Sequence, residues 1–312
     1  MNNEPIFIVG SERSGTTLFR LMLSHHPKIS VCSEFEYAVD PIMFSNRLND
    51  REALNQLSQN WIFKSHGVKL DHEQSWSQNM QKILKDFQFN EQKELSTAIV
   101  HKNFDRLLRI WPNAKFIHLY RDPRDVAKSV VNMGWASHVL SGAKRWVHAE
   151  QCWQKISSEV PQDRFIEISF ESLIQSPKSE LNKVCRFMGI QFDNNMMQYQ
   201  KSSTYQQPDK SICQSWKRKL NDSEIALLEH QLKSWLIKYN YGFSGLNPKK
   251  PSALLMHLLP LKDWFYRFTQ RLKLYGTLNL SLDWSKRNLF LPSSLQQALD
   301  QRMHSCWVKS LK

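Results

Sequence analysis

The feature of this chain that most constrains its fold is a short apolar run followed by a glycine-bounded turn and a helix. Residues 5–10 form a continuous apolar run with β-branched side chains that ends in Gly10, which is typical of a buried parallel strand. A turn-rich stretch leads to Gly15, after which apolar residues recur at helical spacing until Pro27. In this arrangement successive backbone N–H groups and a helix N-terminus face one concavity, so the segment predicts a binding site for a phosphate group.

Apolar runs and helical segments continue to alternate along the chain. Asp122 and Pro123 are the cap and first residue of a predicted helix, and Asp125 lies in its first turn. Strands that alternate with helices predict an α/β fold, here a P-loop-type three-layer domain with a central parallel sheet flanked by helices. Further strands are predicted at residues 29–32, 97–100, 115–120 and 164–169, and helices within 41–95 and over 104–111.

The composition favours a folded protein with anionic partners. The 312 residues include 42 Lys and Arg against 29 Asp and Glu, a formal net charge of +13, which favours nucleotides, sulfated or phosphorylated substrates, anionic lipid or nucleic acid. The five cysteines form no C-x-x-C pair, so neither a zinc site nor a disulfide framework is predicted. No apolar run has the length of a bilayer-spanning helix and no secretory signal is recognisable, so we expect a cytoplasmic protein.

The character of the chain changes near its C-terminal fifth. We therefore predict a main domain, residues 1–247, and a basic, aromatic-rich and mainly helical extension, residues 248–312, which holds 11 Lys and Arg against 3 Asp. A basic amphipathic helix is predicted over 261–275, so residues 253–275 contact a membrane surface peripherally, dock to a partner or pack on the main domain. We do not expect nucleic-acid binding, because apolar residues dilute the basic ones. The sequence gives no indication of the oligomeric state.

The turn lacks the lysine that a nucleoside-triphosphate-binding loop carries. Thr16 stands at that position, and the cation comes earlier, at Arg13. Such a loop can hold one phosphate and place a charge over its distal substituent. Two alternatives stay open on this evidence: a P-loop kinase-like phosphotransferase and a nucleotide-binding module without enzymatic activity.

Two segments resemble those of sulfotransferases that use PAPS (3′-phosphoadenosine 5′-phosphosulfate). Residues 13–18, Arg-Ser-Gly-Thr-Thr-Leu, are similar to the family's 5′-phosphosulfate loop. Residues 120–129 are similar to its 3′-phosphate motif, in which Arg121 and Ser129 match the two anion-binding positions and Arg124 is a further candidate contact. The resemblance implies that PAPS is the co-substrate and that PAP (the 3′,5′-bisphosphate) is the product. The implied cofactor-binding residues in these segments are Arg13, Ser14, Gly15, Thr16, Thr17, Leu18, Arg121 and Ser129.

Within the family, the chain is most similar to the tyrosylprotein branch and its bacterial relatives, over roughly residues 5–245. The segment around Glu34 resembles the one that carries that branch's catalytic base, and the segment around Lys102 resembles the one with its catalytic lysine. Trp216 and Lys217 lie where the family closes a loop over the cofactor. The chain departs from the pattern at three positions, Met133, Phe170 and Ser215.

The resemblance implies transfer of SO3 to an acceptor hydroxyl, with Glu34 as the base and with Arg13 and Lys102 neutralising charge on the leaving group. Glu36 and Glu12 are rival bases, and His25, His26 and His101 are further candidates nearby in the sequence. No metal is expected, because cationic side chains and backbone N–H groups supply the neutralisation. The acceptor class stays open among a sugar, a lipid, a tyrosine and a small molecule.

Overall fold

A computed structural model describes residues 4–40, 50–202, 209–288 and 292–310. At its centre is a five-stranded sheet in which every neighbouring pair of strands is parallel, in the order β2-β3-β1-β4-β5. The strands are β1 (Ile6–Val9), β2 (Ile29–Cys32), β3 (Leu95–Val100), β4 (Lys115–Tyr120) and β5 (Phe165–Ser169). The predicted parallel sheet is thus confirmed, and each predicted strand lies within one or two residues of its observed bounds.

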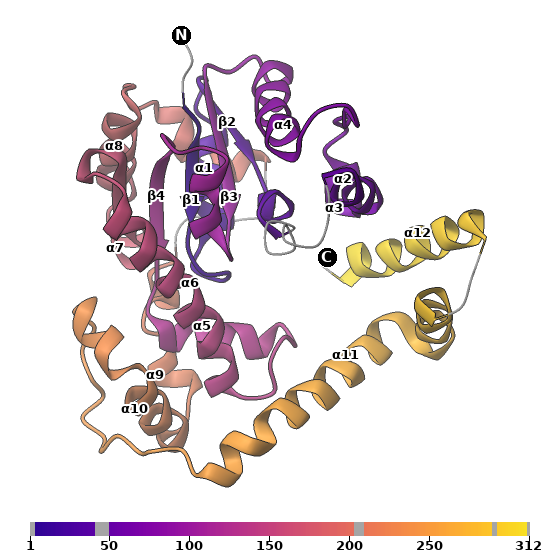
Figure 1. Cartoon of the computed structure of the whole chain (residues 1–312). Coiled ribbons are helices and arrows are strands. Elements are labelled where there is room, and N and C mark those ends of the chain that lie inside the picture. Colours follow the sequence, from indigo (N-terminus) through magenta and orange to yellow (C-terminus); the bar gives the residue numbers. More distant parts are fainter. Residues whose placement is uncertain (1–3, 41–49, 203–208, 289–291, 311–312) are drawn as a thin grey trace.

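Helices cover both faces of the sheet, because alternate residues of the buried strands point to opposite sides (Figure 1). Ile6 and Ile8 pack in one core cluster with residues of α1 (Thr16–Ser24), α7 (Phe170–Gln175) and α8 (Pro177–Met188). Phe7 and Val9 pack in a second cluster with residues of α4 (Trp76–Asn90), α6 (Val139–Glu159) and the 3₁₀ helix η3 (Phe104–Arg109). The three predicted layers are therefore present.

A third apolar cluster lies below the sheet in Figure 1 and joins α5 (Pro123–Asn132) to α6, α9 (Trp216–Lys219) and α10 (Asp222–Lys238). The start of α5 is as predicted: the Asp122 side chain accepts a hydrogen bond from the backbone N–H of Arg124, and Pro123 is in the first turn. Two further helices, α2 (Asp50–Gln59) and α3 (Trp61–Ser65), belong to the stretch predicted to be helical. Part of that stretch, residues 41–49, lies outside the described residues.

Two predicted helices differ in detail from the observed ones. The stretch after β3 is a short 3₁₀ helix rather than an α-helix, since it is entered from the left-handed Asn103 and bonds in i to i+3 steps, for example Ile110 N–H to Leu107 C=O. The helix of the extension begins earlier than predicted: α11 (Ala253–Asn288) starts before Pro260, and its helical backbone is interrupted at Gly276 (φ 75°, ψ 166°), directly after the predicted end at residue 275.

Beyond α11, α12 (Ser293–Ser310) turns back alongside it (Figure 1). Leu259 of α11 is fully buried in the third cluster, so the extension does pack on the main domain at that point. Within the described residues, none of the helices combines the length and the apolar character needed to cross a bilayer.

Candidate functional site

The candidate site lies at the carboxyl ends of β1, β2, β3 and β4, where parallel strands present their loops at one edge of the sheet. Three non-glycine residues on these loops have positive φ: Arg13 (69°) after β1, Glu34 (55°) after β2 and Asn103 (55°) after β3. Such a conformation costs about 1–3 kcal/mol for each residue and tends to cluster at functional sites. Local backbone strain is therefore found at the carboxyl-terminal edge of the sheet, where the sequence motifs predicted the site.

The glycine-bounded loop is closely packed on its neighbours. A Cβ atom on Gly10 would lie 2.1 Å from the carbonyl oxygen of Leu119, and one on Gly15 would lie 2.2 Å from the ring of Phe170. Gly15 also has a φ of 94° as the residue that precedes α1. No larger residue fits at either position without a shift of its surroundings, which explains why the turn is bounded by glycines.

The loop presents donors of the kind that bind an anion. The Oγ atom of Ser14 is buried without a hydrogen-bond partner. The first backbone N–H of α1 bonded within the helix is that of Phe19, to Gly15 C=O, so the N–H groups of the preceding turn have no intrahelical acceptor. The side chain of Thr17 is exposed, whereas that of Leu18 is buried in the core, so Leu18 offers only its backbone N–H.

The structure brings Arg13, Arg121 and Ser129 together, although more than 100 residues separate the loop from β4. The Arg13 Nε donates to Ser129 Oγ at 3.0 Å, and Arg121 Nη1 donates to the carbonyl oxygen of Arg13 at 3.3 Å. The Arg121 guanidinium lies 4.5 Å from the ring centre of Phe170, and its Nε is buried without a partner. The same guanidinium also forms an ion pair with Asp125 of α5, at 3.7 Å. The two predicted anion-binding segments thus lie side by side.

Arg124 does not face this site, so its candidacy as an additional contact is wrong. Its guanidinium is buried between Asp122, at 2.8 Å, and Glu229, at 2.7 Å, and stacks at 3.8 Å on the ring of Trp216. Burial of an arginine requires paired carboxylates, and the capping residue of α5 supplies one of them.

Trp216 belongs to the same buried group, while its neighbour is exposed. The Trp216 side chain is 2% exposed, and its indole N–H donates to Asp122 at 3.0 Å. Its backbone N–H donates to Asp125 at 2.7 Å. Because Asp125 also forms the ion pair with Arg121, Trp216 is linked to Arg121 through this carboxylate. The ammonium of Lys217 lies 5.6 Å from the Trp216 ring, on the exposed side of α9.

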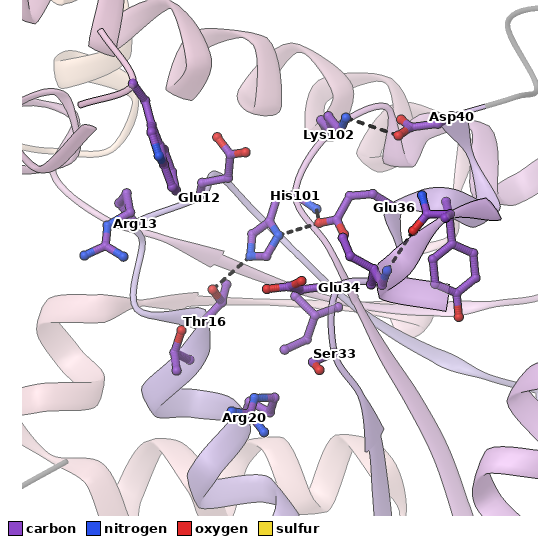
Figure 2. A pocket seen from close by; sticks show the side chains of 16 residues that line it. Glu12, Arg13, Thr16, Arg20, Ser33, Glu34, Glu36, Asp40, His101 and Lys102 are labelled. Carbon is purple, nitrogen blue, oxygen red and sulfur yellow. Dashed lines mark hydrogen bonds and ion pairs between the residues drawn. The ribbon is translucent and has the colours of Figure 1, made fainter. Parts of the chain in front are cut away.

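A cavity of about 420 Å³ adjoins the loop and contains the predicted catalytic residues (Figure 2). Glu34, Arg13 and Lys102 all line it, and Glu34 extends toward its interior in the view of Figure 2. Burial, followed by the charge of Glu36, raises the pKa of Glu34 above its usual range. The ammonium of Lys102 lies 3.2 Å from Asp40 at the rim.

The rival carboxylates are engaged in ion pairs. Glu12 accepts from Arg145 at 2.7 Å. Glu36 lies 2.5 Å from His101 Nδ1, and His101 Nε2 lies 2.9 Å from the hydroxyl of Thr16, a chain of contacts drawn in Figure 2. Sequence reasoning named these residues but missed their connection, because nothing in the sequence states that β2 and β3 are neighbours.

His25 and His26 are remote from this chain of contacts. Both lie at the end of α1, where a His26 ring nitrogen lies 2.9 Å from the carbonyl oxygen of Gln191. Among the residues that the structure describes, no group of three or more His, Cys, Asp or Glu side chains is arranged to hold a metal ion.

Comparison with known proteins gives one family. A model described as "Sulfotransferase family" matches residues 5–194. The protein-tyrosine sulfotransferase of Drosophila melanogaster is 21% identical over 211 residues, which cover 62% of this chain and 40% of that protein. Protein-tyrosine sulfotransferase 1 of Danio rerio is 24% identical over 201 residues, or 62% of this chain and 56% of that protein. The chain thus spans about half the length of these curated relatives.

Solved structures agree on the fold. The sulfotransferase domain from the curacin biosynthetic pathway matches with a TM-score of 0.55 at 20% identity, over 77% of this chain and 98% of that one. The sulfotransferase domain of the Synechococcus PCC 7002 olefin synthase matches with a TM-score of 0.50 at 19% identity, over 86% of this chain and 94% of that one.

Proposed function

The chain belongs to the sulfotransferase family, and from that premise we propose that it transfers a sulfuryl group from PAPS to an acceptor hydroxyl and releases PAP. One observation carries the proposal: Arg13, Arg121 and Ser129 converge beside the glycine-bounded loop, next to a cavity that holds a carboxylate of raised pKa. An adenosine bisphosphate needs two anion sites on one edge of the sheet, and this arrangement provides them.

The residues of the loop fit the 5′ end of the nucleotide. The unpartnered Ser14 Oγ, the free N–H groups of the first turn of α1 and the Thr16 and Thr17 hydroxyls are donors for the 5′-phosphate. The unpartnered Nε of Arg121, together with Ser129 Oγ, suits the 3′-phosphate. Ser129 at present accepts from Arg13, so nucleotide binding releases the Arg13 guanidinium toward the transferring group. From α9, Trp216 supports this site through the hydrogen bond of its backbone N–H to Asp125, the ion-pair partner of Arg121, and Lys217 lies beside the Trp216 ring.

Glu34 acts as the general base. It accepts the proton of the acceptor hydroxyl while the acceptor oxygen bonds to sulfur and the bond from sulfur to the bridging phosphate oxygen breaks. Its raised pKa suits a base that must take up a proton near neutral pH. Arg13 and Lys102 neutralise the charge that develops on the leaving phosphate oxygen and on the transferring group. No step in this scheme requires a metal.

The decisive experiment compares variants in transfer and in binding. Glu34→Ala and Lys102→Ala should lower the transfer rate from labelled PAPS by about a hundredfold to ten-thousandfold and leave PAP affinity nearly unchanged. Arg121→Ala should instead weaken PAP binding. The acceptor is found by the same assay with a panel of sugar, lipid, peptidyl-tyrosine and small phenolic hydroxyls. Full activity in both catalytic variants would show that Glu34 and Lys102 are assigned wrongly.

Thermal unfolding separates this function from the two alternatives. PAP should stabilise the protein strongly and ATP with Mg²⁺ only weakly, because Thr16 replaces the lysine that clamps a triphosphate. Stabilisation by ATP and Mg²⁺ alone would favour a kinase. Strong PAP binding with no transfer to any acceptor class would favour a nucleotide-binding module.

For residues 253–275 we propose peripheral contact with an anionic lipid surface. The face of α11 that carries Leu259 and Asp263 contacts the main domain. At about 100° per residue, a second apolar stripe lies on the opposite face and is exposed, with Leu261 at 64% and Phe265 at 61%. The stripe consists of Leu254, Leu258, Leu261, Phe265 and Phe268.

Basic side chains flank the exposed stripe on both sides. Lys262 and Lys273 lie on one flank, and Arg267 and Arg271 lie on the other, as the helical spacing places them. An apolar stripe between two basic flanks suits the interface of an anionic membrane, where each Lys or Arg contributes about 1 kcal/mol. Asp263 faces the main domain and Asp283 pairs with Arg271 at 3.1 Å, so Lys262, Arg267 and Lys273 keep the flanks basic, and their repulsion disfavours pairing with a second copy of this helix.

Vesicle binding tests the contact. The full chain should sediment with vesicles that contain phosphatidylglycerol, less with pure phosphatidylcholine, and less again at high salt. Leu261→Ser with Phe265→Ser should abolish binding, whereas Phe89→Ser, which removes an even more exposed ring from α4, should not. Equal binding to both vesicle types, or concentration-dependent dimers that the double variant abolishes, would overturn the lipid assignment.

A further inference from the structure

The partly buried histidine that follows β3 has no part in the scheme above, yet it contacts a residue of the glycine-bounded loop. His101 lies between Glu36 and Thr16: its Nδ1 is 2.5 Å from Glu36 Oε1, and its Nε2 is 2.9 Å from Thr16 Oγ1. The backbone N–H of His101 donates to the same Glu36 oxygen at 3.1 Å. The imidazole is therefore fixed at both nitrogens and cannot rotate without breaking contacts on two elements (Figure 2).

The protonation of this imidazole decides which way the Thr16 hydroxyl points. Since Glu36 is an acceptor, Nδ1 carries a proton in either case. If Nε2 is also protonated, it donates to Thr16, and the single hydroxyl proton of Thr16 is left for another acceptor. If Nε2 is unprotonated, the Thr16 hydroxyl donates its proton to the ring and offers only a lone pair to the loop.

The charges around His101 favour the doubly protonated ring. Burial alone would lower the pKa of His101, but the hydrogen bond and charge of Glu36, with Glu12 and Glu34 further away, raise it. The pKa of Glu36 is lowered in turn: burial acts against this, and the His101 hydrogen bond outweighs it. The cations that line the same cavity, Arg13, Arg20 and Lys102, oppose the charged ring; Arg145 pairs with Glu12, and Asp40 with Lys102.

We propose that His101, held as an imidazolium by Glu36, is a positioning residue that makes Thr16 a hydrogen-bond donor to the 5′-phosphate oxygens of the nucleotide. This inference rests on the proposed function, and it concerns how the nucleotide is held rather than how the acceptor is activated. His101 does not act as the base. It sets the direction of one hydroxyl, and it adds a positive charge next to the loop.

The sign of the pH dependence follows from the charge state. The imidazolium is present below the raised pKa of His101 and is lost as the pH rises through it, so PAP affinity should fall on the alkaline side. The loss should be roughly tenfold, the worth of one hydrogen bond to a charged group. Glu36→Gln should move this fall to lower pH, since it removes the charge that holds the proton.

Conservative variants separate positioning from mere packing. A glutamine at 101 can place an amide N–H near the position of Nε2, so His101→Gln should keep moderate PAP affinity and lose the alkaline fall. Thr16→Val should lower the affinity and also lose the alkaline fall, whereas Thr16→Ser should restore both. An alkaline fall that survives unchanged in His101→Gln or in Thr16→Val would overturn the proposal.

Nuclear magnetic resonance of the ring nitrogens gives a direct readout. His101 should show two protonated nitrogens at neutral pH, and PAP should shift its signals. His118 is the internal control, because it likewise contacts carboxylates, Glu150 and Glu167, but takes no part in the site. A bare Nε2 at neutral pH would refute the proposal while leaving the proposed function intact. Failure of the wild-type chain to bind PAP at all would instead refute the proposed function.

Discussion

Two glutamates that stand two residues apart after β2 have opposite electrostatic environments. Glu36 is paired with His101, and this contact lowers its pKa although burial opposes the shift. Glu34 lines the cavity, where burial first and the nearby charge of Glu36 second raise its pKa. Positive φ at Glu34 turns the chain so that these neighbouring carboxylates meet different partners. The backbone therefore places the proposed base and the partner of His101 in different surroundings.

This environment predicts the acid limb of the rate profile. Glu34 must be ionised to accept a proton, so kcat/KM should rise with pH through a pKa displaced upward from that of an ordinary glutamate. Arg20 is a nearby charge that lowers the pKa of Glu34, so Arg20→Gln should move the acid limb to higher pH. Arg51→Gln, a matched change on the exposed side of α2, should leave the limb in place. An acid limb that moves to lower pH in Arg20→Gln would contradict the assignment of Glu34.

Sequence reasoning reached the residues that lie within one local motif and missed the pairings between motifs. Glu34 and Lys102 follow their strands at recognisable positions, and both line the cavity. The contact of Glu36 with His101 depends on the pairing of β2 with β3, which the order of strands along the chain does not reveal. Arg124 was misjudged for the same reason, because its partner Glu229 is 105 residues away on α10.

At the scale of the elements, the start of α5 serves two purposes. Asp122 caps the helix, and it also accepts from the Arg124 guanidinium at 2.8 Å and from the Trp216 indole at 3.0 Å. The helix that carries Ser129 is thereby fastened to α9 and α10. The Asp-Pro signature predicted the cap from the sequence, whereas the buried charge network behind it required the fold.

Removal of this carboxylate should be far more costly than removal of an ordinary cap. Asp122→Ala leaves the buried Arg124 with Glu229 as its remaining carboxylate partner among the described ion pairs, so the free energy of unfolding should fall by about 3–5 kcal/mol. Ser75→Ala removes the exposed capping box of α4 and should cost about 1 kcal/mol. Urea denaturation measures both. Equal losses in the two variants would mean that Asp122 acts only as a cap.

Over the whole molecule, the loop between α5 and α6 connects the C-terminal extension with the candidate site. Asp263 of α11 accepts from the backbone N–H of Ser137 at 2.7 Å and from its hydroxyl at 2.6 Å. Two residues earlier, Trp135 lines the cavity. The guanidinium of Arg145 lies 5.4 Å from the Trp135 ring and pairs with Glu12 of the glycine-bounded loop. The extension is thus linked to the loop of the candidate site through three contacts: Asp263 with Ser137, Trp135 with Arg145, and Arg145 with Glu12.

This connection predicts that a substitution on α11 destabilises the backbone of the loop that forms part of the cavity wall. Asp263→Ala removes the acceptor of the Ser137 N–H, so hydrogen exchange of residues 133–138 should quicken by roughly tenfold, as expected when one charged hydrogen bond is lost. Asp283→Ala, the same substitution further along α11, should leave this exchange unchanged because its described partner, Arg271, belongs to the extension itself. Stabilisation by PAP should persist in both variants, since the loop proposed to bind the 5′-phosphate keeps its own donors. Unchanged exchange in Asp263→Ala would mean that the extension packs on the domain without holding the cavity wall, and residues 253–275 would then act on the surface alone.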